Sequence, residues 1–123
     1  MAILTKEEAC WLENFIVRFL QAFAKNKDDS YSPGELNSNS EGPGLILKAM
    51  GENDWIANHY LSSPRTRALR DADWRREAIR AACERLVRAK RIGVDHCCLS
   101  PRRPNGDGVR GYWAGPDEEE KLR

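Results

Sequence analysis

The second half of the sequence predicts a long amphipathic helix that runs directly into a β-hairpin. The helix is predicted from Asp73 to about Arg91, and its apolar side chains fall on one side at 100° per residue. The residues predicted to face the core are Trp74, Ala78, Ile79, Ala82, Cys83, Leu86 and Val87. The hairpin strands are predicted at 94–99 and 109–114, because the prolines and the Asn-Gly-Asp-Gly run between them favour a turn.

The first half of the chain is predicted to be helical, with one long loop. Thr5 and Glu8 fit a capping box, and apolar residues spaced three and four apart predict a helix from Thr5 to about Lys25. Residues 26–44 are rich in turn-forming residues, which predicts a loop. Short helices are predicted at 45–50, ended by Gly51, at 55–61, capped by Asn53 or Asp54, and at 64–71, after which Asp73 caps the long helix.

Length and composition limit the fold class and the location. With 123 residues, the chain is predicted to form one α+β, mostly helical domain over residues 1–115, followed by a disordered acidic tail at 116–123. No apolar run approaches the roughly 20 residues of a membrane helix, and the N-terminus lacks the basic start and long apolar region of a signal peptide. The four cysteines form no disulfide framework. We therefore expect a cytoplasmic protein without membrane contact.

The net charge of +1 conceals an uneven distribution along the chain. Residues 1–64 carry a formal charge of −4, residues 65–110 carry +7, and residues 111–123 carry −2. A basic segment suits a polyanionic partner, because contacts with phosphates supply most of the non-specific affinity for nucleic acid. The alternative is a solvated charged face that binds nothing.

The order of the predicted elements over about residues 45–115 resembles the winged helix-turn-helix superfamily. The resemblance is carried by Ala78-Ile79, Leu86-Val87 and Ile92 on the long helix and its exit, and by Arg110-Gly111-Tyr112-Trp113 on the return strand. It implies a winged-helix-like DNA-binding protein with a regulatory role in transcription, whose long helix enters the major groove and whose hairpin, the wing, touches the backbone or the minor groove. The chain departs from the pattern in two places. The segment 62–72 is longer than a tight turn unless 64–71 forms the preceding helix, and the usual short strand between the early helices is not evident.

Eight arginines are the candidate nucleic-acid-binding residues. They cluster before and at the start of the long helix and around the hairpin turn: Arg65, Arg67, Arg70, Arg75, Arg76, Arg102, Arg103 and Arg110. Prolines flank the pair Arg102-Arg103, which reduces the entropy lost on docking. The middle of the long helix is assigned no base contact, because Glu77 and Glu84 on its outer side would repel phosphate unless each accepted a hydrogen bond from a cytosine amine.

A protein-interaction or adaptor module on the same scaffold, without DNA binding, is the alternative function. An enzyme is not expected, because no activating constellation of side chains and no small-molecule substrate can be identified. No cofactor is expected. A metal site at His96-Cys97-Cys98 is not expected either, because neighbouring strand residues point to opposite faces.

Two aromatic features leave alternatives open. One of Tyr112 and Trp113 should face outward, and an outward Trp113 could stack on a base, although a core position is the more frequent outcome for a tryptophan. Trp11 and Val17 lie off the apolar stripe of the first helix. This fits either a homodimer contact through that helix or a central core helix.

Overall fold

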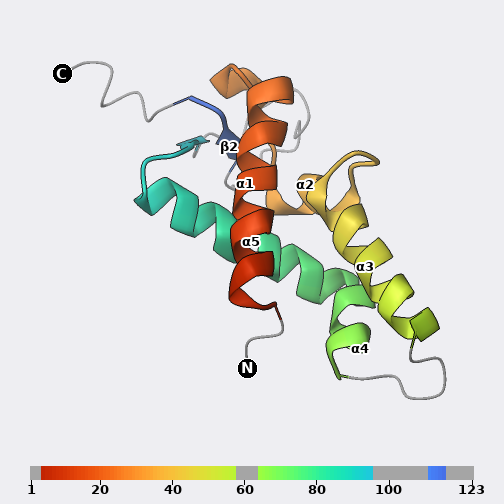
Figure 1. Ribbon diagram of the computed structural model, residues 1–123. Coiled ribbons are helices and arrows are strands. Elements are labelled where there is room, and N and C mark those ends of the chain that lie inside the picture. The colour runs from red at the N-terminus through yellow and green to blue at the C-terminus, as the bar shows by residue number, and fades with distance from the viewer. Residues whose placement is uncertain (1–3, 58–63, 96–110, 116–123) are drawn as a thin grey trace.

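The computed structural model describes residues 4–57, 64–95 and 111–115. Helices and short strands follow one another in these residues (Figure 1): α1 (Lys6–Phe23), the 3-10 helix η1 (Lys27–Asp29), α2 (Pro33–Ser38), α3 (Pro43–Ala57), α4 (Pro64–Arg70), α5 (Ala72–Arg88), β1 (Gly93–Asp95) and β2 (Gly111–Trp113). The fold is therefore α+β and mostly helical, with the long first helix, the long amphipathic helix and the C-terminal hairpin that the sequence predicts. None of the helices in the described ranges has the length and apolar character needed to cross a membrane.

The first helix, α1, lies across α5 and buries its apolar stripe (Figure 1). It begins as predicted, because the Thr5 hydroxyl accepts a hydrogen bond from the Glu8 amide while the Glu8 carboxylate accepts one from the Thr5 amide. The buried positions of the helix are Leu12, Ile16, Phe19 and Leu20. Phe23, in the last turn of the stripe, is 48% exposed. The predicted cap is thus confirmed, and the stripe is buried in its middle.

Helix α2 corrects the prediction of a single loop over residues 26–44. Ser32 caps this helix in a second capping box with Glu35, and Pro33 stands at the first helical position, where no amide proton is needed. Leu36 is fully buried, and α2 packs against α5. A helix of six residues is too short to be stable alone. Its contact with α5 therefore decides its formation.

Helix α3 corrects the prediction of two short helices, because it runs without a break from Pro43 to Ala57. Gly51 is an interior residue of this helix and not its C-cap. A Cβ atom at Gly51 would lie 2.8 Å from the Cβ atom of Leu69, so glycine is what lets α3 and α4 approach so closely. Asn53 and Asp54 accordingly lie inside α3. The predicted helical residues 58–61 lie outside the described residues.

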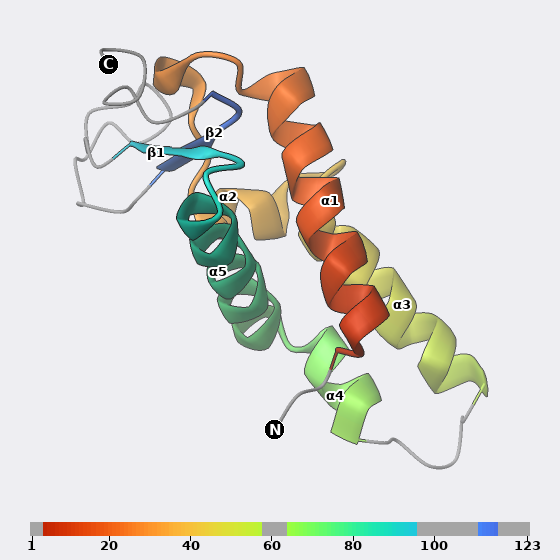
Figure 2. The ribbon, with the colours of Figure 1, turned by 60° about the vertical axis from the view of Figure 1, so that its left-hand side comes forward.

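The helices α4 and α5 meet at a single residue, Asp71 (Figure 2). The helix predicted at 64–71 is confirmed as α4. The N-cap of α5 is Asp71 and not Asp73, because the Asp71 carboxylate accepts hydrogen bonds from the amides of Asp73 (2.8 Å) and Trp74 (3.1 Å). Helix α4 ends at Arg70, so the N-cap of α5 lies two residues earlier than predicted.

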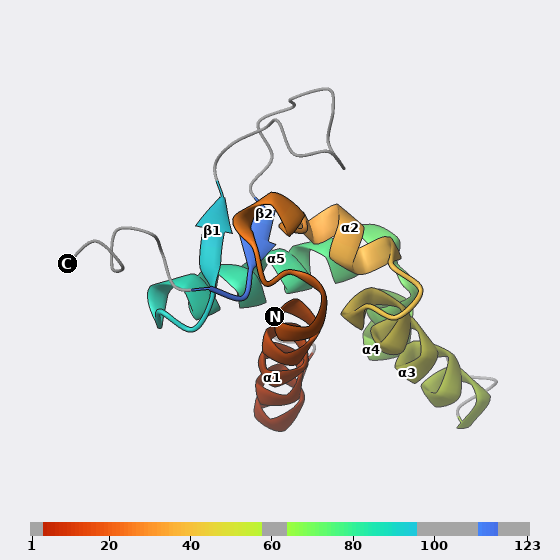
Figure 3. The ribbon, with the colours of Figure 1, turned by 90° about the horizontal axis from the view of Figure 1, so that it is seen from above.

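The hairpin strands β1 and β2 are antiparallel, with Gly93 opposite Trp113, Val94 opposite Tyr112 and Asp95 opposite Gly111. The predicted turn and half of the residues of the predicted strands lie within 96–110, outside the described residues, as does the predicted tail at 116–123. The other edge of β2 pairs with Tyr31, through backbone hydrogen bonds of 2.9 and 2.8 Å to Tyr112. The segment between α1 and α2 lies beside β2 in Figure 3. Tyr31, between α1 and α2, therefore forms a one-residue bridge to the hairpin.

Tyr112 and Trp113 are both buried, with exposures of 1% and 4%, so the prediction that one of them faces outward is wrong. Tyr112 contacts α5, where its hydroxyl donates a hydrogen bond to Glu84. Trp113 packs over the backbone of Gly93, at which a Cβ atom would lie 2.5 Å from the indole Nε1. A strand that is covered on both faces buries both rows of its side chains. Trp113 is therefore a core residue and not a platform for a base.

Candidate nucleic-acid interface

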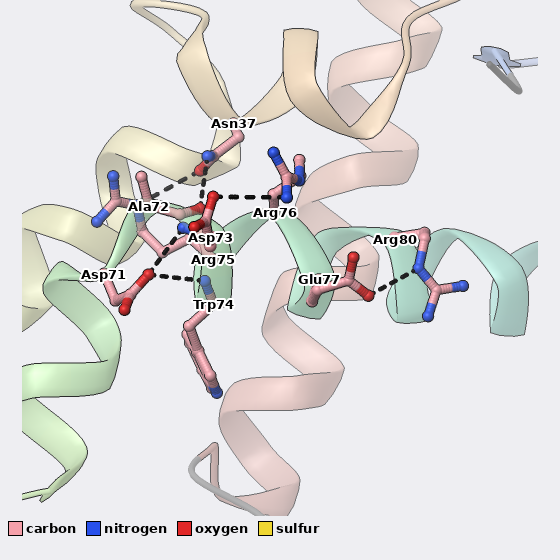
Figure 4. Close-up of polar contacts among 9 residues, drawn as sticks. All are labelled: Asn37, Asp71, Ala72, Asp73, Trp74, Arg75, Arg76, Glu77 and Arg80. Carbon is pink, nitrogen blue, oxygen red and sulfur yellow. Dashed lines mark hydrogen bonds and ion pairs between the residues drawn. The ribbon is translucent and has the colours of Figure 1, made fainter.

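Arg75 is buried at the junction of α2, α4 and α5, with an exposure of 6%. Its Nη1 donates a hydrogen bond of 2.9 Å to the carbonyl oxygen of Leu69, and its Nε lies 3.4 Å from Oδ1 of Asn37. Asn37 in turn donates from Nδ2 to the carbonyl oxygen of Ala72 at 2.9 Å (Figure 4). The guanidinium thus satisfies a carbonyl at the end of α4 and joins three helices. This corrects the assignment of Arg75 as a nucleic-acid contact.

Arg65 is also engaged within the fold, because its guanidinium forms an ion pair with the Glu8 carboxylate in the first turn of α1. The two side chains are 33% and 21% exposed, so the pair is partly shielded from solvent. The pair joins α4 to α1 across 57 positions of sequence. Arg65 therefore has a structural role within the fold, and its assignment as a nucleic-acid contact stays a prediction.

The outer side of α5 carries alternating charges. Arg76 pairs with Asp73 at 3.4 Å, and Arg80 pairs with Glu77 at 2.9 Å (Figure 4). The hydrogen bond from Arg80 to Glu77 raises the pKa of the Arg80 guanidinium above its ordinary value. All four side chains are exposed, and pairs of this kind contribute only about 0–1 kcal/mol. Each arginine can leave its partner for a phosphate, but the two carboxylates keep the formal charge of these four residues at zero.

Arg67 and Arg70 stand in the last turn of α4, immediately before the Asp71 cap, and both are exposed. Arg76 lies one turn into α5 and is exposed as well. These are the predicted site residues that the structure places at the α4–α5 junction with accessible side chains. Arg67 and Arg70 make this junction the first of two basic regions, one at each end of α5.

The second basic region is at the exit of α5 and was not among the predicted site residues. Residues 85–94 contain four basic residues and no acidic one. Arg88, Lys90 and Arg91 are exposed, and we call these three residues the C-terminal basic cluster. Arg91 donates to the neutral side chain of Asn14 at 2.9 Å, and no carboxylate of the described residues pairs with Arg88 or Arg91. The run Arg-Ala-Lys-Arg at the helix exit is the sequence signal that indicates this cluster.

The remaining predicted contacts are the wing arginines Arg102, Arg103 and Arg110, which lie outside the described residues, as does His96-Cys97-Cys98. Among the side chains that the structure describes, no group of three or more His, Cys, Asp or Glu could hold a metal ion. Cys10 is exposed, whereas burial raises the pKa of the Cys83 thiol. Cys83 is fully buried in the core, and a thiol that resists ionisation is a poor nucleophile. Its role is therefore packing.

Comparisons with protein-family models, with curated proteins and with solved structures find no match to this chain. The exposed basic side chains of the described residues can bind anions at two regions. One region lies at the α4–α5 junction and the other at the exit of α5. The surface between them is formally neutral where Asp73, Arg76, Glu77 and Arg80 alternate.

Proposed function

We propose that this protein is a small winged-helix-like module that binds nucleic acid, with double-stranded DNA as its target and a regulatory role. The observation that carries the proposal is the bridge between Tyr31 and Tyr112. It supplies, in reduced form, the short strand that winged-helix domains place between their early helices. The order in which α5 is followed by the hairpin strands β1 and β2 supports the same proposal.

The distribution of charge along α5 supports the same proposal. At a rise of about 1.5 Å per residue, the 17 residues of α5 span about 25 Å. The major groove is only about 12 Å wide, so a helix laid in it reaches the phosphates of a flanking backbone with its ends. Arg67 and Arg70 stand at one such end.

A duplex titration at several salt concentrations tests the proposal. We expect the double variant Arg67→Ala with Arg70→Ala to lose about two phosphate contacts, which lowers the salt slope by about 1.8 and weakens binding about 60-fold at 0.1 M salt. The matched control is Arg18→Ala with Lys48→Ala, which removes two exposed cations of α1 and α3. Circular dichroism checks that each variant is folded. Wild-type protein that does not bind the duplex at low salt, or a control that loses as much affinity, would refute the proposal.

The wing arginines remain proposed contacts and have their own test. The double variant Arg102→Ala with Arg103→Ala should weaken duplex binding, and Arg110→Ala should do so to a smaller extent because it removes one charge instead of two. Unchanged affinity in the double variant would show that the wing makes no contact. The titration is the one used for Arg67 and Arg70.

A protein-interaction or adaptor role is the second candidate, and the alternating ion pairs on α5 favour it. A surface with paired charges of both signs suits a protein partner better than a polyanion. The variant Asp73→Asn with Glu77→Gln separates the two functions. Removing both carboxylates should strengthen duplex binding if α5 meets phosphate, because like charges are removed. Weaker or unchanged duplex binding would favour the adaptor role.

We further propose a homodimer through α1 and a cytoplasmic location, and we propose binding rather than catalysis. The support for a dimer is apolar surface on α1: Phe23 is 48% exposed, and the rings of Trp11 and Phe15, which are only partly buried, lie 5.5 Å apart. Sedimentation of the wild type and of Phe23→Ser tests it. A monomeric wild type would exclude the dimer. The free thiols of Cys10 and Cys83 fit a reducing compartment.

A further inference from the structure

Lys90 has a left-handed backbone conformation, which glycine adopts more readily than any other residue. Its φ is 61°, and no other non-glycine residue in the described part of the chain has a positive φ. The turn that ends α5 is a Schellman motif, in which the Arg91 amide donates to the Leu86 carbonyl and the Lys90 amide donates to the Val87 carbonyl, each at 2.9 Å. Glycine is the usual residue at the position of Lys90, because a side chain destabilises the left-handed conformation.

The helix dipole of α5 does not require a lysine at this position. A cation near a helix C-terminus interacts favourably with the helix dipole, but Arg85 and Arg88 already stand in the last turn. A glycine at position 90 would therefore leave the helix end with its basic residues and remove the backbone strain. Residues that hold an unfavourable backbone conformation are concentrated at functional sites.

We propose that Lys90, together with Arg88 and Arg91, binds a backbone phosphate of the nucleic acid at the C-terminal end of α5. This inference rests on the proposed function and adds a contact that the predicted site residues do not include. The three side chains are exposed at the helix end opposite to Arg67 and Arg70. Because α5 is about 25 Å long, the C-terminal basic cluster supplies a second phosphate anchor, separated from the first by the neutral middle of the helix.

The variant Lys90→Gly tests the inference, because it removes the charge and relieves the backbone at the same time. We expect its melting temperature to rise when measured in high salt, where the interaction of a cation with the helix dipole is screened. We expect its affinity for a labelled duplex to be about eightfold weaker at 0.1 M salt, with a salt slope smaller by about one. Lys90→Arg keeps the charge and should keep wild-type affinity. Lys48→Ala, the matched control on α3, should leave affinity unchanged.

Three results would overturn the inference. The first is an affinity of Lys90→Gly within about twofold of that of the wild type, together with the expected loss of affinity in the Arg67 and Arg70 variants. The proposed function would then stand without this inference. Weaker affinity together with a lower melting temperature would also count against it, because damage to the turn would then explain the loss. A wild-type protein that does not bind the duplex would remove the proposed function and this inference together.

Discussion

The Tyr112 hydroxyl donates a hydrogen bond to Oε2 of Glu84, which ties the return strand of the hairpin to α5. The backbone of the same tyrosine pairs with Tyr31 on one side and stands opposite Val94 on the other. Tyr112 therefore joins α5, β1 and the segment that follows α1. The root of the proposed wing is held against the long helix by one buried side chain.

We expect Tyr112→Phe to lower the free energy of unfolding by about 1–3 kcal/mol, because the partly buried Glu84 carboxylate loses this donor. Glu84→Gln keeps an acceptor oxygen in place and should be less damaging. Urea unfolding followed by circular dichroism measures both variants. A Tyr112→Phe protein as stable as the wild type would contradict the structural role of the bond.

Replacing Arg75 by alanine should lower the free energy of unfolding by about 2–4 kcal/mol, because the buried carbonyl of Leu69 and the half-buried side chain of Asn37 lose their donor. Arg76→Ala is the neighbouring control. Its side chain is exposed, and its loss should change stability by no more than about 0.5 kcal/mol. Equal effects of the two substitutions would show that the contacts of Arg75 contribute little.

Two glycines should respond to alanine in opposite directions. At Gly51, the added Cβ atom would lie 2.8 Å from the Cβ of Leu69, so we expect a net loss of about 1–2 kcal/mol despite the better helix propensity of alanine. At Gly34 in α2, the nearest atom to an added Cβ is the Ser32 Oγ at 3.9 Å, so we expect a gain of about 0.5–1 kcal/mol. Thermal unfolding of both variants measures these two effects. Stabilisation by Gly51→Ala would contradict the close contact between α3 and α4.

Cys83 should make the protein less stable at alkaline pH. Burial raises the pKa of its thiol above the ordinary value of 9.0, so above that pH the unfolded chain releases a proton that the folded chain keeps. The folded state then binds more protons, and stability falls as pH rises, by up to about 1.4 kcal/mol per pH unit from this group. The destabilisation caused by Cys83→Ala should therefore be smaller by about 1 kcal/mol at pH 10 than at pH 8. A difference that stays constant over this range would contradict the shift.

The sequence predicts well those helices whose signals lie within a few residues of one another. The capping box of Thr5 and Glu8, the proline that begins α4 and the apolar face of α5 all act within one or two helical turns, and all three are found in the structure. Helix α2 carries an equally good box at Ser32 and Glu35. It was missed because the surrounding run of Gly, Pro, Asn and Ser indicates a loop, and only the packing of Leu36 outweighs that tendency.

The candidate site residues were chosen by charge, and charge alone does not say which side chains are accessible. That the second half of the chain is basic, and that a long helix precedes a hairpin, follows from the sequence. The tertiary structure decided which arginines stay accessible: Arg65 pairs with Glu8 and Arg75 is buried beside Asn37, whereas Arg67, Arg70 and the C-terminal basic cluster remain exposed. Local sequence patterns act between residues a few positions apart, whereas ion pairing and burial depend on distances in space between segments that only packing brings together.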